Sequence, residues 1–261
     1  MIFDTHAHYD DEQFNQDRNV LLESMQDNGV GSIVNISASY TSCIDSVKFT
    51  HEYPFIYAAV GIHPDEVGTL TEESYQKLIS LYDEEKVVAV GEIGLDYHWD
   101  TYPRDVQKYW FVRQIEEAGL RGLPIAIHSR EAGEATLKII EKYARGITGV
   151  MHAFSYSVEL AREYIKLGYY IGIGGVITFK NAKKLKEVVA DIPIDQMVLE
   201  TDAPYLTPEP FRGKRNNSIY LHYVAEEIAR IKGIDKEKVI EITQQNANKL
   251  YHINESGGMN E

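Results

Sequence analysis

Short apolar segments recur along the chain, and longer segments with helical periodicity separate them. Most of the apolar segments are four or five residues long, and they are continuous rather than alternating with polar residues. Continuous apolar runs are typical of parallel strands that are buried on both faces. Eight such runs are present, at 2–4, 32–36, 56–60, 87–90, 124–127, 149–151, 169–173 and 197–199.

The intervening segments carry apolar residues at helical spacing. Thr71 is a plausible N-cap, because Glu72 and Glu73 follow it in the first turn, where the helix dipole favours acidic residues. A last helix is expected over about 236–250. Two further segments each place their apolar residues on one helical face: Ala132, Ala135, Ile139, Ile140 and Tyr143 in one, and Leu221, Val224, Ala225 and Ile228 in the other.

Strand-like runs that alternate with helical segments predict the α/β class, and eight of them predict a single (β/α)8 barrel of the TIM type. The last helix is expected to pack outside the barrel as an additional C-terminal element. The chain has 261 residues, a length that one such barrel fills. We expect one domain over 1–254, followed by a short, polar and flexible C-terminal tail over 255–261.

Composition narrows the class of protein. The formal net charge of −14 argues against broad electrostatic adhesion to nucleic acid or to an anionic membrane. It leaves open a nucleic-acid enzyme whose site carries its own cations, because divalent metals invert the local field. No run approaches the ~20 apolar residues of a membrane span. No signal peptide is visible, and Cys43 is the single cysteine, so a cytoplasmic location is expected.

Histidine and acidic residues recur at the ends of the predicted strands. His6 and His8 are one residue apart, and alternate side chains of a strand point to the same face. The active site of a (β/α)8 barrel lies at the C-terminal ends of its strands. Side chains that close several strands are therefore expected to converge. Six residues of metal-ligand type occupy such positions: His6, His8, Glu92, His128, His152 and Asp202.

This set suits two divalent ions better than one. A carboxylate has two oxygens and can bridge two metals, and Glu92 is the candidate bridge. His6, His8 and Asp202 would complete one site, and His128 and His152 the other. Two metals about 3.5–4 Å apart are a common device for phosphoester hydrolysis, in which bound water becomes the nucleophile. Asp202 is placed to orient that water or to accept its proton. The metal is left open between magnesium, manganese and zinc, because imidazoles and carboxylates favour different ions.

Other residues are candidates for binding the substrate. His63 follows the third strand. Arg130 follows His128 and is expected either to clamp an anionic oxygen or to pair with Glu131 or Glu134. Arg212 and Arg215 belong to the densest basic stretch, 211–216, which is either a phosphate-binding loop or a solvated loop.

Two further acidic residues lie close to this pattern in the sequence. Asp4 either supports a ligand imidazole through its other nitrogen or lies in the barrel interior. Glu200 shares the strand face of Asp202 and is a further candidate for the metal site.

Several of these segments together resemble the TatD family of metal-dependent deoxyribonucleases, within the broader amidohydrolase-like barrels. The resemblance extends over about 1–251. It rests on Asp4-Thr5-His6-Ala7-His8, Gly61-Ile62-His63-Pro64, Gly91-Glu92-Ile93-Gly94-Leu95-Asp96-Tyr97, His128-Ser129-Arg130, His152-Ala153-Phe154-Ser155 and Glu200-Thr201-Asp202-Ala203-Pro204-Tyr205-Leu206.

The resemblance implies a (β/α)8 barrel and a phosphodiesterase that cleaves DNA, often as an exonuclease from the 3′ end, with some members acting on RNA. It also implies the same six ligand positions. The family commonly has a proline shortly after its Arg-Gly-Lys-Arg-Asn loop, where this chain reads Asn216-Asn217-Ser218-Ile219. Related barrels with a carbamylated lysine carry that lysine at the fourth strand end, where Glu92 stands here.

Two other functions compete with a nuclease. The first is a barrel hydrolase that acts on a small ester, amide, cyclic imide or phosphoester, because the same activated water would serve it and the fold does not decide. The second is an inactive binding scaffold, against which the complete set of ligand residues argues. The expected partner is DNA, as a single strand or an end, with RNA as an alternative and no membrane. The sequence leaves the oligomeric state open.

Overall fold

Eight parallel strands form one sheet in the order of the chain. The structure is a computed structural model, and it describes residues 1–253. Each strand pairs with the next in parallel, from the first to the eighth. The strands are β1 (Ile2–Ala7), β2 (Val30–Ile36), β3 (Ile56–Val60), β4 (Val87–Asp96), β5 (Ile125–Arg130), β6 (Gly149–Met151), β7 (Tyr169–Ile173) and β8 (Met197–Leu199).

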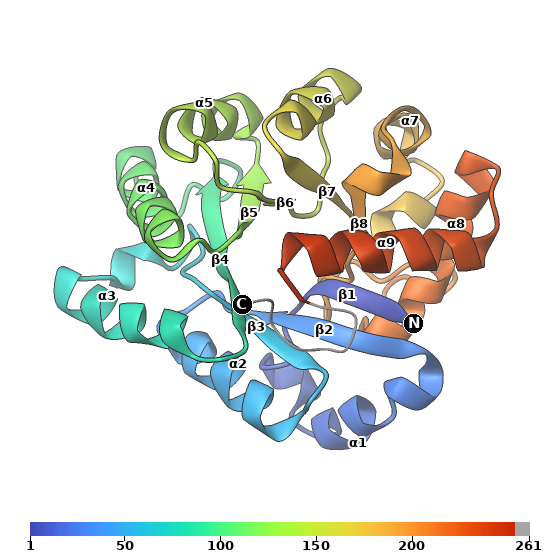
Figure 1. Ribbon diagram of the computed structural model, residues 1–261, viewed down its shortest axis with the longest axis horizontal. Helices are drawn as coiled ribbons and strands as arrows, with labels where there is room; N and C mark the ends of the chain where they lie inside the picture. Colours follow the sequence, from blue (N-terminus) through green and yellow to red (C-terminus); the bar gives the residue numbers. More distant parts are fainter. Residues whose placement is uncertain (254–261) are drawn as a thin grey trace.

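The sheet curls into a nearly closed barrel, because β1 meets the end of β8. The hydroxyl of Thr5 donates to the carbonyl of Leu199 at 2.9 Å. Beyond β8, the amide of Asp202 donates to the carbonyl of His6 at 2.9 Å, and the amide of His8 donates to that of Ala203 at 2.8 Å. Figure 1 shows the helices arranged around this barrel. The predicted (β/α)8 architecture is therefore confirmed.

Helices follow the strands and cover the outside of the barrel. They are α1 (Arg18–Glu23), α2 (Tyr40–Glu52), α3 (Glu72–Ile79), α4 (Arg104–Arg121), α5 (Gly133–Tyr143), α6 (Val158–Lys166), α7 (Lys183–Asp191), α8 (Leu221–Lys232) and α9 (Lys236–Leu250). Short 3-10 turns lie at Glu12–Phe14, Gln26–Asn28, Val67–Thr69, Ser80–Asp83, Gly175–Thr178, Ile194–Gln196 and Ser218–Tyr220.

Local sequence signals account for the helices that were predicted. Thr71 caps α3, because its hydroxyl accepts from the amide of Ser74, whose own hydroxyl accepts from the amide of Thr71. All four predicted apolar residues of α8 are buried. In α5, Ile139 and Ile140 are buried, whereas Tyr143 is largely exposed at the end of the helix.

The fourth strand is longer than its apolar run predicts. Its pairing with β5 continues through Ile93, Gly94 and Asp96, beyond the predicted end at residue 90. The two glycines that interrupt the apolar run let the neighbouring strand approach closely. A Cβ on Gly91 would lie 2.6 Å from the Cβ of Ala126, and one on Gly94 would lie 1.9 Å from the carbonyl oxygen of His128. Glu92 therefore lies inside β4 and not after it.

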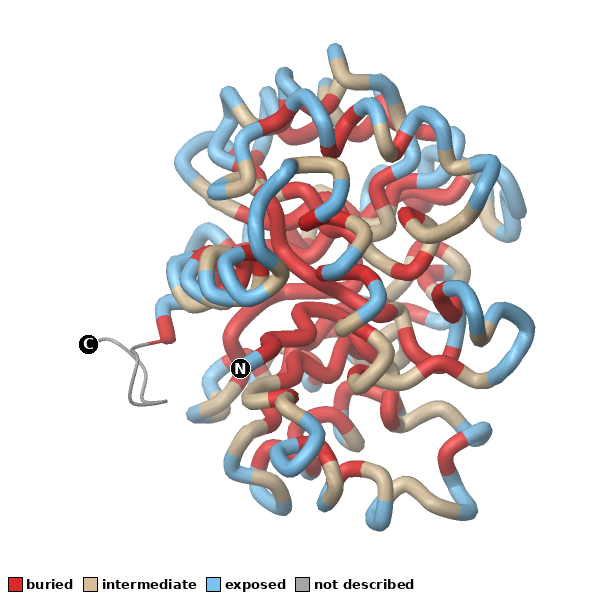
Figure 2. Tube along the Cα trace, turned by 90° about the vertical axis from the view of Figure 1, so that its right-hand side faces the viewer, coloured by how far each residue is buried: buried red, intermediate tan, exposed pale blue. Residues whose placement is uncertain are grey.

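Apolar side chains fill both the barrel interior and the space between strands and helices, and Figure 2 shows the buried chain at the centre of the molecule. The last helix has the predicted bounds and lies across one end of the barrel (Figure 1). Leu250 and Tyr251 pack with the interior residue Phe3. Asn246 donates to the carbonyl of Met197 at the start of β8, at 2.7 Å. Helix α9 thus covers the N-terminal end of the barrel and leaves the opposite end free.

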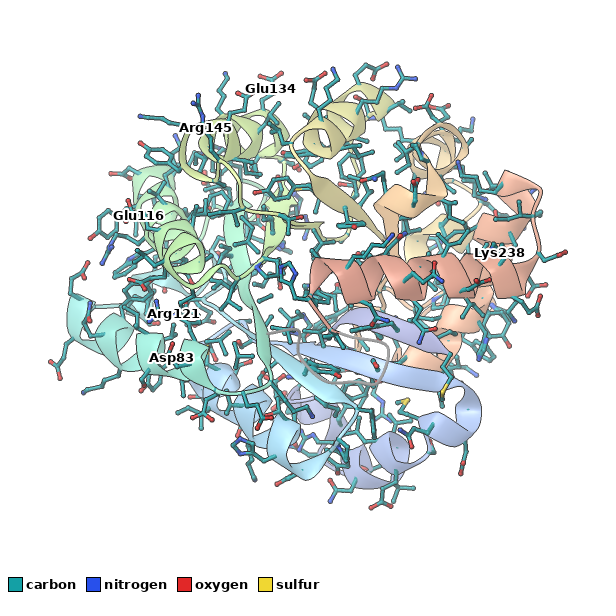
Figure 3. The ribbon with its side chains drawn as sticks, viewed as in Figure 1. Asp83, Glu116, Arg121, Glu134, Arg145 and Lys238 are labelled. Atoms are coloured by element: carbon teal, nitrogen blue, oxygen red, sulfur yellow. The ribbon has the colours of Figure 1, made fainter. Side chains whose placement is uncertain are left out.

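Charged side chains project outward from the surrounding helices. Figure 3 shows Glu116 of α4 and Glu134 of α5 among them. Arg121 of α4 pairs with Asp83 at 3.2 Å and with Glu117 of its own helix. Over residues 1–253, no helix is long and apolar enough to cross a membrane. The predicted tail at 255–261 and the last residue of the predicted domain, 254, lie outside the described residues.

Candidate active site

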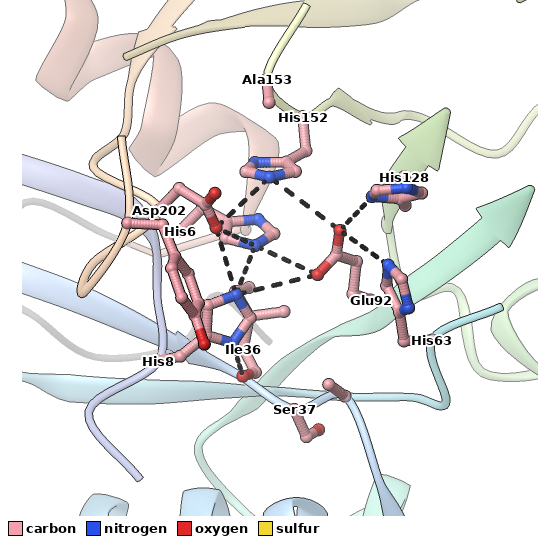
Figure 4. A network of polar contacts seen from close by, with 12 residues as sticks. His6, His8, Ile36, Ser37, His63, Glu92, His128, His152, Ala153 and Asp202 are labelled. Atoms are coloured by element: carbon pink, nitrogen blue, oxygen red, sulfur yellow. Dashed lines mark hydrogen bonds and ion pairs between the residues drawn. The ribbon is translucent and has the colours of Figure 1, made fainter. Parts of the chain in front are cut away.

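All six predicted ligand residues converge at the C-terminal end of the barrel (Figure 4). Three lie within strands: His6 in β1, Glu92 in β4 and His128 in β5. The other three, His8, His152 and Asp202, follow the ends of β1, β6 and β8. This convergence agrees with the position of active sites in (β/α)8 barrels.

The two oxygens of Glu92 point to different imidazoles. Oε2 lies 3.4 Å from Nε2 of His6 and 3.8 Å from Nε2 of His8. Oε1 lies 2.9 Å from Nδ1 of His128. A carboxylate that is held in this way has one oxygen for each of two groups of donors. This is the arrangement that a bridging ligand requires.

Asp202 completes the group around His6 and His8. Its Oδ1 lies 3.3 Å from Nε2 of His8 and 3.8 Å from Nε2 of His6. The backbone of Asp202 has a positive φ of 59°, in the left-handed region that few residues other than glycine adopt. Its hydrogen bond to His6 within the barrel holds this conformation and directs the carboxylate toward the imidazoles.

His152 lies between the two groups and not beside His128 alone. Its Nε2 is 3.5 Å from Oδ1 of Asp202 and 3.9 Å from Oε1 of Glu92. Its ring stacks on that of His6 with the centroids 3.4 Å apart. Three groups have donor atoms close enough to share an ion: His6 with His152 and Asp202, His6 with His8 and Glu92, and His63 with Glu92 and His128.

His63 therefore lies closer to the metal-ligand candidates than its predicted substrate role implies. Its Nε2 is 4.0 Å from Oε1 of Glu92, and its ring meets that of His128 edge-on. Its Nδ1 accepts a hydrogen bond from the amide of Asp65 at 3.1 Å. The proton of this neutral ring therefore lies on Nε2, which faces the site as a hydrogen-bond donor.

Two buried carboxylates orient two of the imidazoles, because each contacts the ring nitrogen that does not face Glu92. Oδ2 of Asp96 lies 2.9 Å from Nε2 of His128. Oε2 of Glu200 lies 3.1 Å from Nδ1 of His152, and its Oε1 accepts from the amide of Ala153 at 2.6 Å. Glu200 was a candidate from the sequence, whereas Asp96 was not singled out. The signal was available, because Asp96 is four residues from Glu92 in one strand and so shares its face.

Asp4 contacts no imidazole among the described residues, and the interior alternative holds for it. Its carboxylate accepts from the hydroxyls of Thr201 and Ser218 and from the amide of Thr201. Burial raises the pKa of Asp4 to about 6, although these hydrogen bonds oppose the shift. Asp4 thereby fixes the segment that precedes Asp202.

The imidazoles differ in their proton affinity. Burial disfavours the charged form of each, but neighbouring carboxylates outweigh it at His8, His128 and His152. The hydrogen bond and charge of Asp202 raise the pKa of His8 to about 9, and Asp96 and Glu92 raise that of His128 to about 9. Burial and His128 lower the pKa of His63 to about 3.

The same charges act on the carboxylates. Burial favours the neutral form of Glu92, yet His6, His152 and His128 hold its pKa well below the usual value. The negative charge of the carboxylates in this centre is thus stabilised by the positive charge of neighbouring imidazoles. This is the charge that a divalent cation would supply.

The donor set fits a divalent metal. Imidazole nitrogens and carboxylate oxygens are the ligands that zinc and manganese accept, and the set contains no thiolate. The buried Nδ1 of His6 has no hydrogen-bond partner among the described residues. His6, His8, Glu92, His128, His152 and Asp202 would hold the metal.

A cavity of about 840 Å³ opens above these residues. His63 and Arg130 line it, as do Trp99 and Tyr205, which the sequence did not single out for the site. Within residues 1–253, Arg130 is not paired with Glu131 or Glu134. Its guanidinium instead lies 5.4 Å from the ring centre of Trp99.

The two arginines of the basic stretch do not line this cavity. Arg212 lies over the ring of Phe179, with its guanidinium carbon 4.2 Å from the ring centre. Arg215 forms an ion pair with Asp17 at 2.6 Å and covers the ring of Phe14. Their predicted contact with the substrate stays a prediction, and the geometry supports it for neither.

A (β/α)8 barrel with imidazoles and carboxylates gathered at its C-terminal mouth defines a metal-dependent hydrolase. The family model described as TatD related DNase matches residues 3–252 of the chain. The protein belongs to the TatD family. A relative in Bacillus subtilis, the uncharacterized metal-dependent hydrolase YabD, is 46% identical over 97% of this chain and 100% of its own length. YcfH of Escherichia coli, similarly described, is 30% identical over 98% of this chain and 97% of its own.

Solved structures agree with this assignment. The crystal structure of YjjV, a TatD homologue from Escherichia coli, has a TM-score of 0.90 and 29% identity, and covers 97% of this chain and 98% of its own. A lactonase variant from Deinococcus radiodurans, described as PTE-like, has a TM-score of 0.64 with 12% identity, covering 96% of this chain and 95% of its own. That second likeness concerns the fold alone.

Proposed function

We propose that this protein is a metal-dependent deoxyribonuclease that removes nucleotides from the 3′ end of DNA, using two divalent ions. The observation that carries the proposal is the placement of Glu92, whose two oxygens face two different groups of imidazoles. Two-metal sites are a recurrent solution to phosphodiester hydrolysis. Membership of the TatD family supports DNA as the substrate, and the 3′-to-5′ direction rests on the resemblance to that family.

The metal would polarise the phosphate and activate the attacking water. Asp202 is suited to orient that water and to accept its proton. Its carboxylate is partly exposed to the cavity. Burial opposes its ionisation, but His152, His8 and His6 lower its pKa, so it is ionised at neutral pH. Asp96 and Glu200 keep the rings of His128 and His152 in place.

The charge around the cavity favours a chain end over a long duplex. Arg130 is the one lysine or arginine among the described residues that line the cavity. Besides the carboxylates that contact the imidazoles, the lining includes those of Asp10, Asp11 and Glu66. A duplex that crossed this mouth would bring many phosphates against those acids, whereas an end brings few.

The same observation favours a second candidate, a hydrolase of a small phosphoester or ester. A cavity with one arginine can bind a small anion without any polynucleotide. A magnesium, manganese or zinc ion would serve either substrate.

The test uses purified protein and single-stranded DNA labelled at its 5′ end, with magnesium, manganese or zinc, and with a chelator as control. A ladder that shortens by single nucleotides from the 3′ end is expected. Circular single-stranded DNA of the same sequence should stay intact, and RNA of the same sequence measures the preference for deoxyribose. Cleavage of the circle would contradict the exonuclease mode. Absence of nucleotide release with all three metals would contradict the proposed function.

A further inference from the structure

Trp99 is exposed at the mouth of the cavity. It lies after β4, is 63% exposed, and lines the cavity. The other tryptophan, Trp110, is 6% exposed and packs against Tyr75 and Tyr109. A solvent-exposed indole next to the candidate active-site cavity offers apolar surface to a ligand.

The position of Trp99 is tied to the candidate metal centre through one carboxylate. Oδ1 of Asp96 accepts from the amides of Trp99 and His98, both at 2.9 Å. Oδ2 of the same carboxylate lies 2.9 Å from Nε2 of His128. The backbone that carries the exposed indole is therefore tied to the same carboxylate that contacts the ring of His128. A group that stacks on this indole would be positioned relative to the reacting atoms.

Arg130, at the end of β5, lies over the indole. Its guanidinium carbon is 5.4 Å from the ring centre of Trp99, and β4 and β5 pair at Asp96 and Arg130. The exposed indole offers a flat apolar surface beyond the part that the guanidinium covers, and the guanidinium offers a site for an anion. Aromatic rings stack on bases without regard to their identity, and guanidinium groups bind phosphate oxygens.

We propose that Trp99 and Arg130 form a subsite for the terminal nucleotide of the substrate, in which the base stacks on the indole and a phosphate contacts the guanidinium. The subsite rests on the proposed nuclease function for its role in the reaction. It predicts little preference among the four bases, because stacking uses the face of a base and not its edge.

The first experiment compares two oligonucleotides that differ only in whether the 3′-terminal nucleotide carries a base. Trp99→Ala should raise KM for the base-bearing oligonucleotide by at least about fivefold, which is the low end for loss of one stacked base. It should leave KM for the abasic oligonucleotide unchanged. Trp99→Phe retains a ring and should stay close to the wild-type protein. Tyr143→Ala removes an exposed aromatic residue at the end of α5 and serves as the control.

The second experiment measures binding without turnover. Deoxythymidine monophosphate, added to the chelator-treated protein, should quench tryptophan fluorescence in a saturable manner. Trp99→Phe should remove the quench, because the remaining Trp110 is buried. Arg130→Gln should weaken the binding, since it removes the phosphate contact. A quench that persists in Trp99→Phe would overturn the subsite.

The proposed nuclease function and the proposed nucleotide subsite can be refuted independently. If the wild-type protein cleaves DNA while Trp99→Ala shows the same KM for both oligonucleotides as wild type, the subsite is refuted and the nuclease stands. If no DNA is cleaved but the nucleotide still quenches Trp99 in an Arg130-dependent manner, the nuclease is refuted and the nucleotide subsite stands.

Discussion

Asp96 and His128 are joined across neighbouring strands by a contact of 2.9 Å between a carboxylate oxygen and Nε2 of the ring. Burial raises the pKa of the Asp96 carboxyl, but its hydrogen bonds with His128 and with two backbone amides outweigh burial and hold the pKa at about 2. The carboxylate is therefore ionised throughout the neutral range. One side chain thus fixes both a candidate ligand ring and the loop that carries Trp99.

Asp96→Asn should weaken binding of divalent metal by about 10- to 100-fold, the usual cost of losing the partner of a ligand histidine. The amide keeps the shape of the side chain but removes the negative charge that orients the ring. Titration calorimetry with manganese or zinc measures the change. Asp100→Asn is the matched control, because Asp100 is exposed and pairs only with Arg104 among the contacts described. Equal metal affinity in Asp96→Asn and wild type would rule out this role.

Removal of metal should destabilise the protein. The site concentrates carboxylates and imidazoles whose mutual arrangement a divalent ion would stabilise. At a free ion concentration of a hundred times Kd, binding adds about 2.7 kcal/mol to the free energy of unfolding. For a protein of this size that corresponds to about 5–10 °C in Tm. Thermal unfolding with chelator, and again after manganese or zinc is restored, measures the shift.

Glu92→Gln provides the comparison for that shift. The amide cannot bridge two ions, so the increase of Tm on adding metal should be much smaller than in wild type. DNA hydrolysis should fall by at least about a hundredfold, as is usual for loss of an electrostatic group in an active site. A full shift of Tm in Glu92→Gln, together with wild-type turnover, would contradict the bridging role.

Arg215 should matter for stability and not for substrate binding. Its ion pair with Asp17 spans two distant parts of the chain, and the guanidinium covers the ring of Phe14. Arg215→Gln should lower the free energy of unfolding by about 1 kcal/mol, because the pair is partly exposed and solvent screens it. KM for DNA should stay within about twofold of wild type, because the guanidinium is engaged by Asp17 and lies outside the cavity lining.

If Arg215→Gln raised KM for DNA and left the free energy of unfolding unchanged, the loop over 211–216 would be supported as a phosphate contact. Asp17→Asn breaks the same ion pair from the other side and should lower stability similarly. Arg212→Gln tests the second arginine of the stretch, which lies over Phe179 outside the cavity lining. A rise of KM in both arginine variants, without a change in Asp17→Asn, would show that the loop binds the substrate.

Glu227 should contribute stability that acid removes. Its hydrogen bonds with Arg230 at 2.8 Å and Lys186 at 3.0 Å outweigh burial and lower its pKa to about 2 from the usual 4.5. The stabilisation is therefore complete above about pH 4.5 and is lost as the pH falls toward 2. Wild type should exceed Glu227→Gln in free energy of unfolding at pH 7, and the difference should shrink through this range.

Urea unfolding at several pH values, in the presence of chelator, measures this difference. Glu226→Gln removes an exposed charge from the preceding position of α8 and should show no such dependence. A difference between wild type and Glu227→Gln that stays constant from pH 7 down to about pH 2 would contradict the assignment.

The sequence by itself determined the architecture and the end of the barrel that carries the site. Continuous apolar runs that alternate with helical segments indicate buried parallel strands, since such strands have both faces covered. Ligand-type residues at the ends of those runs then share one rim, because every strand of a parallel barrel points the same way. His6, Glu92 and Asp202 could be placed together on this argument alone.

Only the tertiary structure decided which groups pair with which. His152 lies with His6 and Asp202, His63 faces Glu92, and Arg215 is engaged by Asp17. Periodicity tells which face and which end a residue occupies, but distances across a barrel depend on the register of distant strands and on side-chain rotamers. Those quantities are set by packing between segments far apart in the chain, and no local pattern records them.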